Sequence, residues 1–92
     1  GGGTVVIKEL QVQNQLGFHA RVASRITRCA SGFESLVRVK KDGKNYDLKS
    51  VTGVMMANAK HGETVTVEFE GADEQEAAQA MEALFADKFG ER

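Results

Sequence analysis

Residues 63–70 read Glu-Thr-Val-Thr-Val-Glu-Phe-Glu, and polar and apolar side chains alternate from Thr64 to Glu70. Valine or phenylalanine stands at every second position, and threonine or glutamate stands between them. Because successive side chains of a β-strand point to opposite faces, this pattern predicts a strand with one buried side. A sheet of such strands needs a cover on one face only, which favours helices packed on a single side.

Three further segments are expected to be strands. Thr4–Gln13 is rich in β-branched and aliphatic residues, and Leu36, Val37 and Val39 indicate a second strand. Asn45–Leu48 follows the turn residues Lys41-Asp42-Gly43-Lys44. Because Asp-Gly tolerates the positive φ angles of tight hairpin turns, the second and third strands are predicted to form a hairpin.

Three helices complete the pattern. The first begins at Ala20, and its predicted apolar face consists of Val22, Ile26, Cys29, Ala30 and Phe33. Gly32 is expected to end it. Ser50 is a good N-cap for a short second helix. The last helix is predicted to start with a capping box of Asp73 and Glu76 and to end at Gly90. The order β-α-β-β-α-β-α predicts an α+β fold, an open-faced β-sandwich.

The length and composition limit the classes of protein to which this chain can belong. Ninety-two residues allow one domain, expected over 4–92, and Gly1 to Gly3 are interpreted as a cloning remnant. No apolar run approaches the roughly 18 residues of a membrane span. The single cysteine, Cys29, excludes an internal disulfide and a cysteine-based metal cluster, and a cytoplasmic location is expected. Two histidines 42 positions apart do not argue for a metal site.

The net charge of −1 hides an asymmetry. Residues 1–50 carry nine Lys/Arg and four Asp/Glu, a balance of +5, whereas residues 51–92 carry three and nine, a balance of −6. The folded chain could show a positive and a negative face, which suits docking to charged partners. Ordinary solvated faces are the alternative interpretation.

His19 is the strongest chemical candidate. It stands just before the first helix, whose first amides, on Ala20, Arg21 and Val22, have no partner within the helix. Such amides and the helix dipole form an anion site, and a guanidinium adds a permanent charge suited to phosphate oxygens. Imidazole is a nucleophile near neutral pH. These groups are the minimum for holding a phosphoryl group on a ring nitrogen; a histidine that merely caps the helix is the alternative.

The segment Gly17-Phe18-His19-Ala20-Arg21, with Leu16 before it and Ala23 after it, resembles the active-site signature of HPr. HPr is the histidine phosphocarrier of the phosphoenolpyruvate-dependent sugar phosphotransferase system. Lys49-Ser50-Val51, followed by Gly53-Val54-Met55, resembles the regulatory serine segment of the same family. The resemblance covers nearly everything from Thr4 to Phe89. It implies a four-stranded antiparallel sheet covered on one face by three helices.

The resemblance also implies a role for each site residue. His19 would accept a phosphoryl group on Nδ1 from phosphorylated Enzyme I and pass it to a histidine of a sugar-specific IIA domain. Arg21 would neutralise the phosphate, and the amides of Ala20, Arg21 and Val22 would hydrogen-bond it. The chain would then be a carrier on which enzymes act, and no cofactor or metal is expected.

Further partners are implied in the same way. Ser50 would be the target of an HPr kinase/phosphorylase, and a transcription regulator is a further expected partner. A monomer is expected, because His19 must be reached by successive partners. The docking surface would lie on the first two helices and include Phe18, Arg21, Arg25, Val51, Thr52 and Met55.

Two positions depart from the family pattern. Val22 stands where the family usually has proline, which leaves one more free amide and a looser first turn. Thr52 stands where relatives often carry a larger apolar residue such as methionine. These departures leave open a mainly regulatory HPr paralogue. A nucleic-acid binder that uses the basic first half is disfavoured by the net charge and the few aromatic residues.

Overall fold

The computed structural model describes residues 4–91, so the interpretation of Gly1 to Gly3 as a cloning remnant concerns residues outside the described part. The order of elements is the predicted one. The elements are β1 (Val6–Gln11), α1 (Ala20–Ser31), β2 (Leu36–Lys41), β3 (Lys44–Asp47), α2 (Val51–Ala57), β4 (Thr64–Glu70), α3 (Glu74–Ala86) and a short 3-10 helix, η1 (Lys88–Gly90).

The four strands form one antiparallel sheet in the order β1-β4-β2-β3. The alternating segment became β4 and lies inside this sheet, where it pairs with β1 on one side and with β2 on the other. Val65, Val67 and Phe69 are buried, and the residues between them face the other side. The predicted half-buried strand is therefore confirmed.

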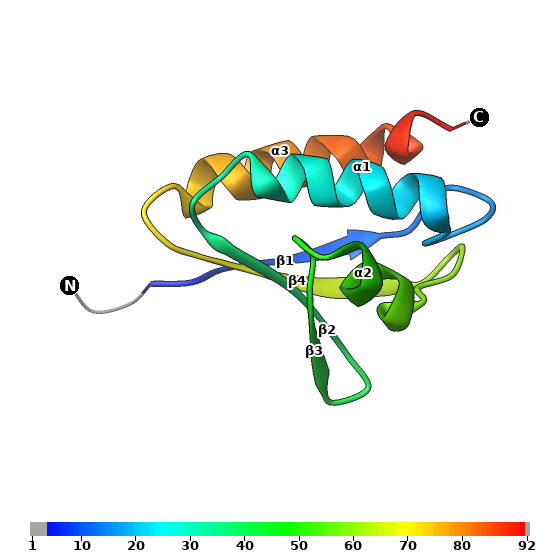
Figure 1. Ribbon diagram of the computed structural model, residues 1–92, viewed down its shortest axis with the longest axis horizontal. Coiled ribbons are helices and arrows are strands. Elements are labelled where there is room, and N and C mark those ends of the chain that lie inside the picture. The colour runs from blue at the N-terminus through cyan, green and yellow to red at the C-terminus, as the bar shows by residue number, and fades with distance from the viewer. Residues whose placement is uncertain (1–3, 92) are drawn as a thin grey trace.

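The helices cover one face of this sheet. Figure 1 shows α1 and α3 side by side along the sheet, with the β2–β3 hairpin reaching beyond them. The shorter α2 packs against α1 and β3. The predicted open-faced sandwich is confirmed. None of the helices within residues 4–91 is long and apolar enough to cross a membrane.

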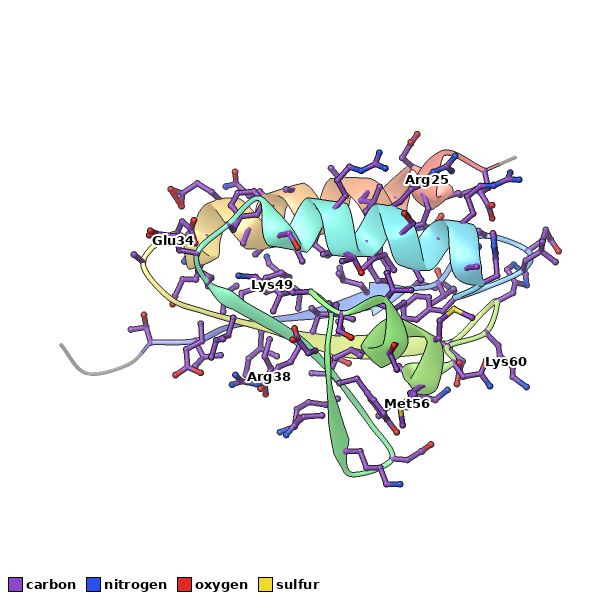
Figure 2. All side chains as sticks on the ribbon, viewed as in Figure 1. Arg25, Glu34, Arg38, Lys49, Met56 and Lys60 are labelled. Carbon is purple, nitrogen blue, oxygen red and sulfur yellow. The ribbon has the colours of Figure 1, made fainter. Side chains whose placement is uncertain are left out.

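Charges from the two halves of the chain meet on the open face of the sheet. Arg38 of β2 extends away from α1 and α3 (Figure 2), and its guanidinium lies 2.8 Å from Glu68 and 3.1 Å from Glu70 of β4. The hydrogen bond with Arg38 holds the pKa of Glu68 below its usual value. Separated charged faces are thus absent from this part of the sheet. Positive and negative charges are separated between two of the helices. The charged residues of α1 are all arginines, and those of α3 are all glutamates.

The predicted end of α1 is confirmed and that of the last helix is not. Gly32 is the C-cap of α1, with a right-handed φ of −75°. The last helix stops at Ala86, and Gly90, with a φ of +77°, closes η1 instead. The Asp-Gly hairpin is confirmed, since Asp42 and Gly43 have φ angles of 53° and 77°.

The predicted capping box of Asp73 and Glu76 is wrong. Asp73 makes no side-chain bond to its own helix. Its carboxylate accepts instead from the amides of Glu34 and Ser35, each at 2.9 Å, and from the Ser35 hydroxyl at 2.5 Å. Asp73 therefore fastens the start of α3 to the loop between α1 and β2. The neighbouring Glu74 accepts from the amide of Gly71 at 3.0 Å.

Replacing Asp73 by asparagine is expected to reduce stability in a pH-dependent way. The hydrogen bonds from Ser35 and Glu34 lower the pKa of this carboxyl below its ordinary 3.8. Its stabilisation is therefore full above the ordinary value and is lost as the pH falls through the lowered one. Urea unfolding from about pH 7 to about pH 2 should show a shallower acid loss in Asp73→Asn than in the wild type. Glu76→Gln, at the same helix end, is the control, and equal acid loss in Asp73→Asn and wild type would contradict the prediction.

Candidate functional site

Gly17 fixes the path of the chain into the candidate site. Its φ is +65°, and a Cβ at this position would lie 2.4 Å from the carbonyl oxygen of Ala59. The amide of Phe18 donates to that same carbonyl at 2.8 Å. His19 then takes an extended conformation, with φ −97° and ψ 177°, as the residue that precedes α1. Glycine is required here by both the positive φ and the close approach.

The first turn of α1 presents free backbone donors beside His19. The amide of Ala23 donates to the carbonyl of His19 at 2.8 Å and starts the helical ladder. Within residues 4–91, the amides of Ala20, Arg21 and Val22 have no helical or capping partner. They point outward along the helix axis at the positive end of its dipole. The Arg21 side chain is exposed at the same end.

His19 contacts a carboxylate from the far end of the chain. Its Nε2 lies 2.9 Å from Oε1 and 2.8 Å from Oε2 of Glu91. Glu91 was not among the predicted site residues, because 72 positions separate it from His19 and no local pattern joins them. The hydrogen bond with His19, followed by the one from Asn14 and by the charge of Arg21, lowers the pKa of Glu91. Glu91 is therefore ionised near neutral pH.

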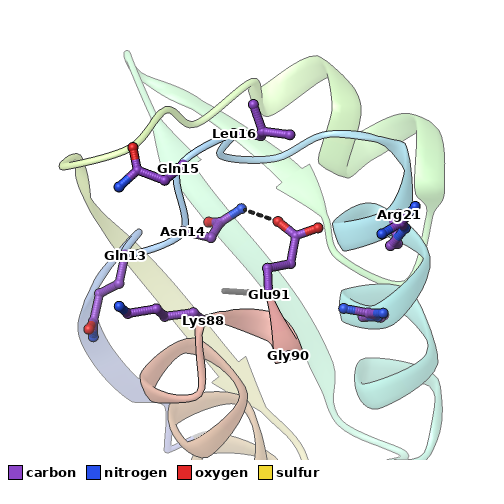
Figure 3. Close-up of a pocket in the computed structure, with 9 residues that line it drawn as sticks. Gln13, Asn14, Gln15, Leu16, Arg21, Lys88, Gly90 and Glu91 are labelled. Carbon is purple, nitrogen blue, oxygen red and sulfur yellow. Dashed lines mark hydrogen bonds between the residues drawn. The ribbon is translucent and has the colours of Figure 1, made fainter.

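Asn14 holds the carboxylate in place and was also absent from the predicted site. It is 2% exposed, and its Nδ2 donates to the carbonyl of Gly17 at 2.8 Å and to Oε1 of Glu91 at 3.0 Å. Figure 3 shows the Glu91 carboxylate between Asn14 and the first turn of α1, which carries Arg21. The side-chain amide of Asn14 thus links the loop before His19 to Glu91, the hydrogen-bond partner of the His19 ring.

A tight reversal after α3 brings Glu91 to this position. Lys88, Phe89 and Gly90 have φ angles of 56°, 56° and 77°, so three consecutive residues are left-handed. The strain at Phe89 is offset by complete burial of its ring against Phe18 and Phe85, with centroid distances of 6.2 and 4.7 Å. The guanidinium of Arg25 donates to the carbonyl of Phe89.

A hollow of about 320 Å³ lies between the loop before His19 and this turn (Figure 3). Apart from Leu16 and Gly90, its lining side chains are polar, and they include the cations of Arg21, Arg25 and Lys88 and the Glu91 carboxylate. No group of three His, Cys, Asp or Glu within residues 4–91 could hold a metal ion.

A model of the family described as "PTS HPr component phosphorylation site" matches residues 6–87. The chain belongs to the HPr family of phosphocarrier proteins. A relative named phosphocarrier protein HPr, from Cupriavidus necator, is 45% identical over 84 residues, which are 91% of this chain and 94% of that one.

Solved HPr-family structures share the fold. The crystal structure of HPr-C-His from Thermoanaerobacter tengcongensis has a TM-score of 0.85 at 38% identity, covering 97% of this chain and 98% of that one. Crh, a Bacillus subtilis catabolite repression protein described as a dimer with a swapping domain, has a TM-score of 0.73 at 33% identity. That match covers 88% of this chain and 93% of Crh.

The docking residues that the HPr resemblance implies do not all lie on the surface. Val51 and Met55 are 45% and 41% exposed, and Thr52 is exposed beside them. Phe18 must be corrected, because it is only 4% exposed and its ring belongs to the core with Phe85 and Phe89. Arg25 is half-buried, since it also holds the carbonyl of Phe89.

Two apolar side chains extend the exposed surface near these docking residues. Met56 is 66% exposed and lies on the side of α2 that faces away from α1 (Figure 2). Leu16, just before the His19 loop, is 74% exposed. Both lie next to the HPr motifs in the sequence, and this proximity is the signal by which they could have been predicted as surface contacts.

The structure also places the other positions that the sequence singles out in this HPr-family chain. The Ser50 hydroxyl accepts from the amide of Gly53 at 3.1 Å, so the predicted N-cap of α2 is confirmed. Gly53 is needed rather than merely tolerated, because a Cβ there would lie 2.3 Å from the carbonyl oxygen of Asp47. Cys29 is half-buried, and burial raises the pKa of its thiol. His61 is exposed in the turn before β4.

Gly17→Ala is expected to cost more than about 2 kcal/mol of unfolding free energy, because a positive φ and a clash with Ala59 coincide. Gly43→Ala is the matched control. It also has a positive φ, of +77°, but nothing lies within 4 Å of the place that its new methyl group would occupy. It should cost only about 1 kcal/mol. Urea unfolding of both variants checks the difference, and equal costs would show that contact with Ala59 is unimportant.

Proposed function

We propose that His19 accepts a phosphoryl group on Nδ1 from phosphorylated Enzyme I and passes it to a histidine of a sugar-specific IIA domain. The observation that carries this proposal is the position of His19 directly before the first turn of α1, which contains free amides and Arg21. Donors fixed around a partly exposed nucleophile stabilise the charge of a phosphoryl group as it arrives. The family of the chain supports the same chemistry.

The docking surface in this proposal is a positive rim around an apolar centre. Arg21 and Arg25 of α1 supply the charge, and Val51, Thr52 and Met55 of α2 supply the exposed contact area. Phe18 is left out because its ring is buried. Such a surface suits an acidic patch with an apolar middle on Enzyme I and on a IIA domain. We propose that the chain acts as a monomer in the cytoplasm, where successive partners reach one site.

Ser50 is proposed as the target of an HPr kinase/phosphorylase. It stands directly before Val51 in the proposed docking surface. A phosphate there would add about −1.5 to −2 charges next to contacts that are otherwise apolar or positive. Phosphorylation of Ser50 would therefore weaken docking of an acidic partner and favour a different one, such as a transcription regulator.

The carrier function is tested by labelling. Incubation with purified Enzyme I and labelled phosphoenolpyruvate should place an acid-labile label on the wild type and none on His19→Ala. His61→Ala is the matched control, because it removes the other histidine from an exposed turn and should keep the label. An unlabelled wild type, or a label that persists in His19→Ala, would overturn the proposal.

Val22→Pro tests the departure from the family pattern. Since the amide of Val22 has no helical partner, proline there would lose no hydrogen bond of the helix, but it would remove one donor from the site. We expect phosphoryl transfer to survive with altered rates. Quenched time courses measure phosphoryl transfer from Enzyme I to the chain and from the chain to a IIA domain. Unchanged rates in both steps would mean that the residue at position 22 does not affect transfer.

A mainly regulatory role in carbon or nitrogen control is the second candidate. It is favoured by the fold and sequence similarity to Crh, whose name refers to catabolite repression. The presence of His19 argues against a chain that works through its serine alone. The labelling experiment separates the two candidates, because a purely regulatory chain would take no label from phosphoenolpyruvate.

A further inference from the structure

We propose that Glu91 is a positioning residue that keeps the proton of the His19 ring on Nε2 and so directs phosphorylation to Nδ1. This inference rests on the proposed phosphocarrier function and assigns a cause to its regiochemistry. It arises from the contact between His19 and a carboxylate that reaches the ring from the other end of the chain.

The geometry defines which ring nitrogen carries the proton. Both carboxylate oxygens of Glu91 lie within 2.9 Å of Nε2. An ionised carboxylate is only an acceptor, so the hydrogen between these atoms belongs to the ring. A neutral imidazole has one N–H, and therefore the lone pair stands on Nδ1. This is how a carboxylate fixes the tautomer of a histidine in catalytic triads and metal sites.

Glu91 is held firmly enough to perform this role. Its side chain is 16% exposed, Asn14 donates to one of its oxygens, and the buried Phe89 anchors the backbone two residues earlier. Among residues 4–91, the charged groups that share a hollow with this carboxylate are Arg21 and Arg25 of α1, Lys88 of η1 and Asp87 after α3. Three of these four groups are cations, so the surroundings favour the ionised form of the carboxylate.

The same contact serves transfer in both directions. The Nδ1 lone pair attacks the phosphorus of the donor's phosphohistidine, and the new N–P bond forms as the donor's N–P bond breaks. The His19 ring keeps its Nε2 proton and becomes a cation, which the Glu91 carboxylate stabilises. When the IIA histidine takes the phosphoryl group, the N–P electron pair returns to Nδ1 and the ring becomes neutral again. No proton has to enter or leave the site.

The tautomer is measured first, without any partner protein. Side-chain ¹⁵N shifts of His19 at a pH where the ring is neutral should show almost only the Nε2–H form in the wild type. Glu91→Gln keeps the shape but can accept from or donate to Nε2, so the ratio of tautomers should fall roughly tenfold. Asp87→Asn, an exposed residue four positions earlier, makes the same charge change and should leave the ratio unchanged.

Regiochemistry is measured next with phosphoramidate, a small donor that brings no docking surface. We expect phosphorylation of the wild type and Asp87→Asn at Nδ1, and a mixture of Nδ1 and Nε2 products in Glu91→Gln and Glu91→Ala. A wild-type tautomer ratio and a wild-type product in both Glu91 variants would overturn the inference. This failure differs from failure of the carrier proposal, which appears as an unlabelled wild type with phosphoenolpyruvate and Enzyme I.

Discussion

The edge-to-face cluster of Phe18, Phe85 and Phe89 holds together the end of the molecule where His19 lies. Its rings come from the loop before α1, from the last turn of α3 and from η1, with centroids 4.7 to 6.2 Å apart. Buried aromatic pairs add directional contacts to the hydrophobic effect. Phe18 directly precedes His19, and Phe89 lies two residues before Glu91. The packing of these rings therefore fixes the backbone positions of both functional residues.

Much of the fold was predictable because its signals are local. The alternation in Thr64–Glu70 identified a central strand that is paired on both sides, and Asp42-Gly43 identified the hairpin. The helix ends were less predictable, since a residue can satisfy a partner far away in the sequence. Asp73 and Glu76 have the spacing of a capping box, yet the Asp73 carboxylate accepts a hydrogen bond from the backbone amide of Ser35, 38 positions earlier.

The candidate site was predictable in part for the same reason. His19 and Arg21 could be found because a glycine loop, a histidine and a helix start follow one another in the chain. Glu91 and Asn14 could not, because their contacts exist only after the turn at η1 has folded back onto the loop before α1. Phe18 was misplaced, since a position inside a functional motif does not reveal whether a side chain faces solvent or core.

The cross-strand ion pairs of the open sheet face decide which charges a distant molecule can sense. Arg38 and Lys40 lie against Glu68 and Glu70, and these two positive and two negative charges cancel at a distance. Arg21, Arg25 and Arg28 span about 10 Å of α1, comparable with the Debye length of about 8 Å in physiological salt. An approaching protein therefore meets these three arginines as one positive patch. The rate of encounter should depend on ionic strength far more than a net charge of −1 suggests.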